Sequence, residues 1–385
     1  MKLITPRSSA AVCVLLVISC TLLGCGGGSS TPPPPPPPPV AKPEFLYATA
    51  LNQVLAFTID TTSGTLNAPT TNPGPNVGFG IVATPSGSFL YVSDPGGDAI
   101  DGFSINPTTG TLSQVSGSPF SVGSAQGPGG LAIDPAGKFL FATEISAGTV
   151  AAFTINSATG ALTAVQGSPF PASTFPAQAA VDPTGKFLYV SNYNDPAGGV
   201  SAYTINSTSG ALTAIAGSPF PTQAFGGPAG LAVHSGGKFL YVSLAGTANP
   251  NHLIAAFTID TASGALGPVV GSPFSAGLAP LHIALDPTGK FLYAANINMQ
   301  DSTVSAFTID VSSGVLTPVS GSPFPAGAVG GLTVDSSGKF LYVANSPDTI
   351  TGFNINPSNG ALMQFSGAPF SAGASPLNLT TVAMK

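Results

Sequence analysis

The sequence has little charge, and its arginine and cysteine residues are confined to its first 25 positions. Only 6% of its 385 residues are charged, and the formal net charge is -6. This deficit of basic residues argues against a nucleic-acid-binding protein, which needs basic patches. The only arginine, Arg7, lies in a segment that we expect to be removed. The mature chain would then have no guanidinium group with which to clamp a phosphate or a carboxylate.

All three cysteines, Cys13, Cys20 and Cys25, lie in the same N-terminal stretch. Disulfides and thiolate metal sites are therefore excluded from the rest of the chain. Asp94, Asp98 and Asp101 are close together in the sequence but do not have the spacing of a calcium-binding loop. We expect no cofactor and no metal site.

The first residues have the pattern of an export signal. A basic start is followed by an apolar stretch at about 10–23, which is short for a membrane span and ends in small residues. The sequence Leu22-Leu23-Gly24-Cys25 resembles a bacterial lipoprotein cleavage site, which predicts a signal peptide at 1–24 and lipidation of Cys25. Cleavage before Cys20 and an ordinary secretory signal are the alternatives.

A tether at 25–43 follows the signal. It begins with glycine and serine and continues with the prolines of 32–39, which in polyproline II conformation form a semi-rigid stalk of roughly 25 Å. A proline-rich recognition ligand is the other interpretation. A spacer suits a monomeric, lipid-anchored protein of the bacterial cell envelope, and we place it in the outer membrane, on the periplasmic or the outer side.

The remaining chain is dominated by one repeated apolar triplet. Glycine (48) and proline (39) are abundant, and hydrophobic residues make up 43% of the sequence. The triplets, 44 to 52 residues apart, are Phe45-Leu46-Tyr47, Phe89-Leu90-Tyr91, Phe139-Leu140-Phe141, Phe187-Leu188-Tyr189, Phe239-Leu240-Tyr241, Phe291-Leu292-Tyr293 and Phe340-Leu341-Tyr342. This period is typical of one four-stranded propeller blade.

One repeat shows how a blade is built. Short strands are predicted at 130–133, 138–143 and 149–155, with a fourth beginning at Ala161. The second and third strands are apolar throughout because neighbouring blades cover both of their faces. Gly-Ser-Pro-Phe closes most repeats and suits an outer edge strand, where proline blocks pairing with other chains.

The ends of the repeat region predict how the ring closes. Residues 44–49 have the pattern of a second strand, whereas 377–382 resemble a first strand. The C-terminal strand would therefore join the N-terminal blade. We predict an all-β fold over 44–385, a seven-bladed β-propeller with four antiparallel strands per blade.

The seven copies differ mainly in the loops between second and third strands and in the links between blades. In a propeller both sets lie on one face, and loops on a rigid scaffold commonly carry function. Neutral drift would also produce such variation. Candidate ligand-face residues are Asp94, Tyr193, His252 and Met299.

The repeats resemble a known family. Tyr189-Val190-Ser191-Asn192 and Tyr342-Val343-Ala344-Asn345 are similar to YVTN-type repeats, and the whole unit resembles the lactonase-type seven-bladed propellers, which include 6-phosphogluconolactonase-like proteins. The resemblance implies a Pro-Arg-His segment on an inner strand and an Asn-Glu pair after the next strand. The matching stretches are Pro280-Leu281-His282 and Asn296-Ile297, so the histidine is present while the arginine and glutamate are missing.

Two functions follow from these observations. The missing residues favour a non-catalytic envelope lipoprotein whose loop face binds a protein or a glycan. The alternative is a lactone hydrolase in which His282 acts as general base. Glu144, in another blade, is the only other weak catalytic candidate. The interpretation that we favour for His282 from the sequence is a partly buried histidine hydrogen-bonded to a neighbouring strand.

Replacement of Cys25 tests the predicted anchor. We expect Cys25→Ser to move the full chain from the membrane fraction to the soluble fraction, because it removes the acylated side chain. Cell fractionation measures the effect, and Cys20→Ser is the matched control. Release by Cys20→Ser alone would contradict the assignment of Cys25.

Overall fold

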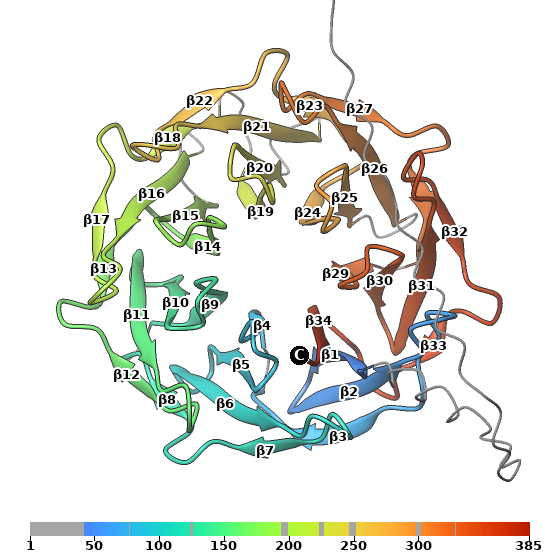
Figure 1. The fold of residues 1–385 in the computed structure, drawn as a ribbon, viewed down its shortest axis with the longest axis horizontal. Helices are drawn as coiled ribbons and strands as arrows, with labels where there is room; N and C mark the ends of the chain where they lie inside the picture. Colours follow the sequence, from blue (N-terminus) through green and yellow to red (C-terminus); the bar gives the residue numbers. More distant parts are fainter. Residues whose placement is uncertain are drawn as a thin grey trace, which may run out of the picture. The chain divides into compact units, whose positions relative to one another are not determined.

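The computed structural model describes residues 42–76, 78–123, 126–193, 199–222, 227–245, 252–297, 302–327 and 329–385. Within these ranges the chain forms strands and turns, and no helix long and apolar enough to cross a membrane is present. The strands form seven small antiparallel sheets in a ring, with one sheet per blade (Figure 1). The predicted all-β, seven-bladed propeller is confirmed.

The innermost strands surround the centre of the ring (Figure 1). In order from blade 1 to blade 7 they are β34 (Leu379–Ala383), β4 (Ile81–Ala83), β9 (Pro128–Ile133), β14 (Pro176–Val181), β19 (Pro228–Val233), β24 (Pro280–Leu285) and β29 (Val329–Val334). The C-terminal strand β34 pairs with the first strand of the chain, with Phe45 opposite Val382. The predicted closure of the ring by the C-terminus is therefore confirmed.

The second and third strands of each blade form its central hairpin. The second strands are β1 (Glu44–Ala50), β5 (Phe89–Asp94), β10 (Phe139–Glu144), β15 (Phe187–Asn192), β20 (Phe239–Leu244), β25 (Phe291–Asn296) and β30 (Phe340–Asn345); the third strands are β2 (Gln53–Ile59), β6 (Ala99–Ile105), β11 (Thr149–Ile155), β16 (Gly199–Ile205), β21 (Leu253–Ile259), β26 (Thr303–Ile309) and β31 (Thr349–Ile355). Nearly all their side chains are buried. This agrees with the prediction that neighbouring blades cover both faces of the second and third strands.

The outer edge differs from the predicted single fourth strand. In six blades it is divided into two short strands that both pair with the third strand, whereas blade 1 has one outer strand, β3 (Thr70–Pro73). The divided pairs are β7 (Leu112–Gln114) and β8 (Phe120–Ser121), β12 (Leu162–Ala164) and β13 (Phe170–Pro171), β17 (Leu212–Ala214) and β18 (Phe220–Pro221), β22 (Leu266–Pro268) and β23 (Phe274–Ser275), β27 (Leu316–Pro318) and β28 (Phe324–Pro325), and β32 (Leu362–Gln364) and β33 (Phe370–Ser371). The two short strands are separated by Gly-Ser-Pro-Phe in five of these blades and by Gly-Ala-Pro-Phe in blade 7. In the five blades the serine hydroxyl accepts a backbone N–H of the third strand, as Ser118 does from Gly102.

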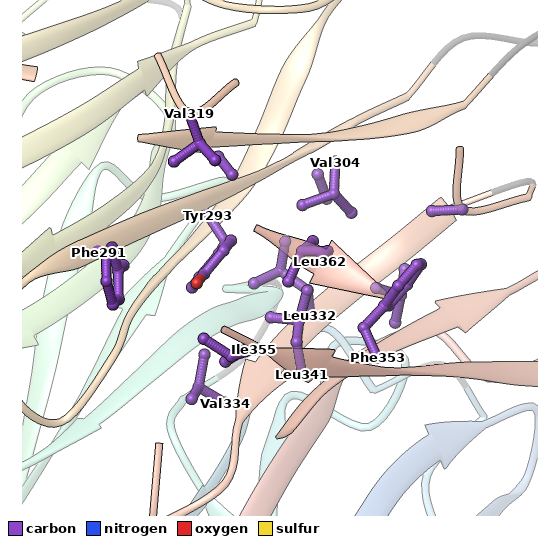
Figure 2. Close-up of a cluster of buried hydrophobic side chains, with 14 residues drawn as sticks. Phe291, Tyr293, Val304, Val319, Leu332, Val334, Leu341, Phe353, Ile355 and Leu362 are labelled. Atoms are coloured by element: carbon purple, nitrogen blue, oxygen red, sulfur yellow. The ribbon is translucent and has the colours of Figure 1, made fainter. Parts of the chain in front are cut away.

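The core is divided into clusters between neighbouring blades. Side chains alternate along each strand, so Phe291 and Tyr293 face blade 7 while Leu292 faces blade 5. Figure 2 shows the cluster between blades 6 and 7, in which Tyr293 of blade 6 packs with Leu332 and Phe353 of blade 7. Each blade therefore contributes to two cores.

The tyrosine of the repeated triplet also links each blade to the next one by a hydrogen bond. Its buried hydroxyl donates to the carbonyl oxygen of a glycine in the turn before the next outer strand, at 2.7 to 3.0 Å. The pairs are Tyr47 and Gly110, Tyr91 and Gly160, Tyr189 and Gly264, Tyr241 and Gly314, Tyr293 and Gly360, and Tyr342 and Gly64. Blade 3 carries Phe141 in this position and has no hydroxyl to donate.

The same turn glycine contacts the phenylalanine of the triplet. Gly360 has a φ of 75°, and a Cβ placed on it would lie 2.5 Å from Cδ1 of Phe291. A side chain here would be strained by the backbone and would displace the ring. The phenylalanine, tyrosine and glycine thus form one joint between blades.

Phe141→Tyr tests this joint. The new hydroxyl would donate to the carbonyl of Gly210, the equivalent turn glycine of blade 4, and stabilise the protein by about 1 kcal/mol. Tyr189→Phe is the matched control and should destabilise it by a similar amount. Urea denaturation measures both as shifts in midpoint. Destabilisation by Phe141→Tyr would show that the joint between blades 3 and 4 is packed too closely for a hydroxyl.

Candidate functional site

The inner strands begin, the second strands end and the third strands begin at one end of the ring, which we call the mouth. A cavity of about 510 Å³ is located there. Its lining residues include Phe79, Ile145, Phe175, Tyr193, Leu281, Ile297, Pro376 and Leu377. The wall is therefore mostly aromatic and aliphatic.

One residue of each blade, at the mouth end of the inner strand, forms a ring around the channel. From blade 2 round to blade 1 these are Gly80, Gly130, Gln178, Gly230, His282, Gly331 and Asn378. Hydrogen bonds support this alignment, because the backbone N–H of Gly80, Gln178, Gly230 and Asn378 each donates to a hydroxyl in the equivalent place of the adjacent second strand. Three polar side chains therefore stand among glycines.

The glycines of this inner ring make room for the polar residues. A Cβ on Gly130 would lie 2.5 Å from Oε1 of Gln178, and one on Gly331 would lie 2.8 Å from Oδ1 of Asn378. A Cβ on Gly230 would lie 3.1 Å from Cα of His282. Each polar residue is thus packed against a glycine of the preceding blade, and a larger residue there would displace it.

Gln178, His282 and Asn378 form the floor of the mouth cavity. All three are half-buried, and all three also line a narrower cavity of about 120 Å³ that continues along the inner strands. Nδ2 of Asn378 donates to the carbonyl of Phe79 at 2.8 Å, which fixes the amide. Within the described ranges, the side chains of Gln178 and His282 make no hydrogen bond. Their donors and acceptors are available to a ligand.

Burial sets the charge of His282. It lowers the pKa of the imidazole from 6.5 to about 4, so the ring is neutral at neutral pH. A neutral imidazole has one nitrogen that donates a hydrogen bond and one that accepts. No aspartate, glutamate or lysine is among the described residues that line the cavity. The floor therefore offers neutral polar groups only.

Aromatic side chains border the cavity. The rings of Phe175 and Tyr193 are 5.9 Å apart and tilted, and the backbone N–H of Tyr193 donates to the carbonyl of Phe175 at 2.9 Å. Phe175 is 39% exposed and Phe79 is 46% exposed. Clustered exposed aromatic residues on a soluble fold commonly mark a binding site.

Glu144 lies away from the cavity lining. Its side chain is completely buried at the end of β10, where Oε2 accepts the hydroxyl of Thr149. Burial raises the pKa of this carboxyl, and Oε1 has no partner among the described residues. Glu144 is therefore buried inside blade 3 and is not among the residues that line the cavity.

The acidic residues of blade 2 are also outside the lining. Asp94 ends β5, Asp98 lies in the loop, and Asp101 is within β6, so the three do not share one loop. Burial and the neighbouring Asp94 raise the pKa of Asp101 to about 6. No group of three or more histidine, cysteine, aspartate or glutamate residues in the described ranges could hold a metal ion.

Two of the remaining ligand-face candidates can be placed. Tyr193 lines the cavity, whereas Nδ1 of His252 accepts the backbone N–H of Ala279 at 3.0 Å and holds the link into blade 6. Met299 and the predicted lipidation site Cys25 lie outside the described residues. A hydrogen bond from His282 to a neighbouring strand, the structural alternative for this residue, is absent from the described part.

The sequence interpretation missed Gln178 and Asn378. The signal was present, because alignment of the inner strands on His282 gives glycine in four blades and a polar residue in only three.

Comparison with known proteins agrees with the fold. A family model described as "Lactonase, 7-bladed beta-propeller" matches residues 44–174 and 215–329, more than half of the chain. No curated protein among those compared matches the chain.

Solved structures with similar folds cover nearly the whole chain. A candidate 6-phosphogluconolactonase of Bacteroides fragilis has a TM-score of 0.75 at 20% identity, covering 90% of this chain and 100% of its own. The periplasmic gluconolactonase of Pseudomonas aeruginosa has a TM-score of 0.70 at 19% identity, covering 89% and 100%. A functionally unknown protein of Desulfotomaculum acetoxidans has a TM-score of 0.67 at 14% identity, covering 89% and 99%. At these identities the similarity shows the fold alone.

The low pKa of His282 predicts a pH-dependent contribution to stability. Between pH 6.5 and about 4 the unfolded chain binds a proton on this residue that the folded chain does not, so stability falls as pH falls through this window. In His282→Asn this contribution is absent. The difference in free energy of unfolding between the two proteins should therefore change by about 1–2 kcal/mol across the window, after allowing for solvent screening. Urea denaturation at several pH values measures it, and a constant difference would contradict the lowered pKa of His282.

Proposed function

The chain belongs to the seven-bladed β-propeller lactonases, and from this membership we propose that it hydrolyses a lactone in the mouth cavity. The observation that carries the proposal is the neutral imidazole of His282, which lies on the cavity floor with no hydrogen-bond partner in the described structure. A general base needs a free acceptor nitrogen facing the substrate.

The floor residues suggest how the reaction would proceed. The lactone carbonyl oxygen would accept a hydrogen bond from the amide of Gln178, which orients the ester and stabilises negative charge on that oxygen. A water molecule attacks the carbonyl carbon while the acceptor nitrogen of His282 takes its proton. The bond between the carbonyl carbon and the ring oxygen then breaks, and the proton from His282 goes to that oxygen. The product is a hydroxy acid, and the histidine is neutral again.

Asn378 would have a positioning role. Its Nδ2 is held by the carbonyl of Phe79, so its Oδ1 is presented in a fixed orientation. Since Oδ1 is an acceptor, it can bind a hydroxyl or the attacking water beside His282. Residues placed in this way reduce the entropy cost of bringing water and ester together.

The site departs from the pattern that the family resemblance implies. Leu281 stands where an arginine is expected and Ile297 where a glutamate is expected, and both line the cavity. The proposed reaction therefore relies on one base and neutral hydrogen-bond groups. Ligand binding without hydrolysis, which the missing charges favour, is the outcome that the experiment below separates from catalysis.

We further propose that the protein acts in the bacterial cell envelope. The support is the N-terminal sequence alone, in which a lipoprotein-like Leu22-Leu23-Gly24-Cys25 is followed by a proline-rich spacer. A spacer would hold the folded body away from the membrane. A protein or glycan that binds this mouth is the second candidate for its ligand.

Assay of the full chain against a panel of lactones tests the proposed reaction. We expect His282→Ala to lower kcat/KM by about 100-fold or more, because general base catalysis typically contributes that much. Met363→Ala is the matched control, since this residue is 68% exposed on outer strand β32. No turnover on any lactone, or full activity in His282→Ala, would contradict the proposal.

The pH profile gives an independent readout of the same residue. The base must be neutral, so kcat/KM should fall on the acid side with an apparent pKa of about 4 and stay level toward neutrality. This decrease of kcat/KM on the acid side, the acid limb of the profile, should be absent from the residual activity of His282→Ala. An acid limb that persists in His282→Ala would assign the base to another group.

A further inference from the structure

Among the described residues, lysines lie only at the end of the ring opposite the mouth. The inner strands run from the mouth to the other end, where they turn into the second strands, and most lysines lie in these turns. The lysines of the described residues are Lys42, Lys138, Lys186, Lys238, Lys290, Lys339 and Lys385, and each flanks this opposite end of a strand. The mouth has no lysine or arginine in the described part of the chain.

Aspartates lie near the mouth. Asp94 ends a second strand, and Asp98 and Asp348 lie in the loops after such strands. Oδ1 of Asp98 accepts the backbone N–H groups of Gln126 and Gly127 at 2.8 and 3.0 Å. An anionic ligand approaching this end would meet negative charge and no cation to offset it.

Inside the cavity a charged ligand would lose its hydration without compensation. The wall is formed by aromatic and aliphatic groups, among them Phe79, Tyr193, Leu281 and Ile297. Transfer of an ionised group into such surroundings is costly unless an opposite charge pairs with it. The polar groups on the floor, which carry no formal charge at neutral pH, can hydrogen-bond an ester but cannot pair with an ion.

The size of the cavity leaves room for more than a lactone ring. Its volume is about 510 Å³, which lies within the usual range for small-molecule sites. A water molecule accounts for about 30 Å³ of liquid, and a ring of five or six atoms displaces only a few of them. A bare ring on the floor would therefore leave the apolar wall in contact with water.

We propose that the mouth cavity selects an uncharged lactone with an apolar alkyl or aryl substituent: the ester binds Gln178, His282 and Asn378 and the substituent covers the aromatic wall. This assignment rests on the proposed function for the reacting group. The ligand class itself rests on the wall and on the charge distribution.

Three lactones that share one ring test the assignment with the full chain. The first carries an alkyl chain, the second has no substituent, and the third carries an alkyl chain of the same length ending in a carboxylate. Each methylene buried on the wall contributes to binding, so we expect kcat/KM to be at least about 10-fold higher for the first than for either of the others. The preference over the unsubstituted ring should persist at high salt, because it comes from apolar contact.

Ile297→Lys tests the role of the wall. Because a cation on the wall can pair with the terminal carboxylate, this variant should reduce or reverse the preference for the uncharged alkyl lactone over the anionic one. Leu278→Lys is the matched control, since Leu278 is 48% exposed and is not part of the cavity lining. It adds the same charge near the mouth and should leave the preference largely unchanged.

Calorimetry with the lactam analogue of the alkyl lactone, which resists hydrolysis, separates ligand class from chemistry. Binding of the lactam without turnover of any lactone would support the ligand class and overturn the hydrolysis. Hydrolysis with equal or greater kcat/KM for the anionic or unsubstituted lactone would overturn the ligand class and leave the reaction intact. Neither binding nor turnover would overturn both.

Discussion

The joint between neighbouring blades is the interaction on which the rest of the molecule depends. A tyrosine hydroxyl of one blade donates to a turn glycine of the next, and a phenylalanine two residues earlier packs on that glycine. Burial raises the pKa of the tyrosine, as at Tyr47, so the hydroxyl stays protonated and remains a donor. Since the contact recurs around the ring, it fixes the distance and angle between blades. The position of every inner strand around the channel follows from it.

A scaffold held in this way can carry functional groups where the packing is tightest. The inner strands approach so closely at the mouth that glycine is required in the preceding blade wherever a polar residue projects. Gln178 lies against Gly130, His282 against Gly230 and Asn378 against Gly331. The spacing of the polar groups is therefore set by the geometry of the ring, and the wall above them can change without disturbing it. In this chain the wall is apolar.

Much of the architecture could be predicted from the sequence because it is repeated. The Phe-Leu-Tyr triplets gave the number of blades, and the strand-like residues at both ends gave the closure. The repeat did not reveal that the tyrosine hydroxyl joins two blades, because this bond links turns and strands from different copies. Nor could the site be predicted in full. Gln178 and Asn378 each occur once, with no motif around them, and only their place in the ring gives them a role. His282 was found because histidine is rare here and because a resemblance pointed to it.

The closure of the ring has a consequence for the cavity. Asn378 directly precedes the closing strand β34, its backbone N–H donates to the hydroxyl of Thr49, and the backbones of Leu377 and Thr49 are also bonded. The floor of the cavity is thus built partly from the seam where the two ends of the propeller meet. By mass action, a ligand that binds Asn378 favours the closed seam over an opened one. Occupancy of the mouth would therefore lower the population of molecules in which the last strand, Leu379–Ala383, is detached, and would protect this strand from proteases.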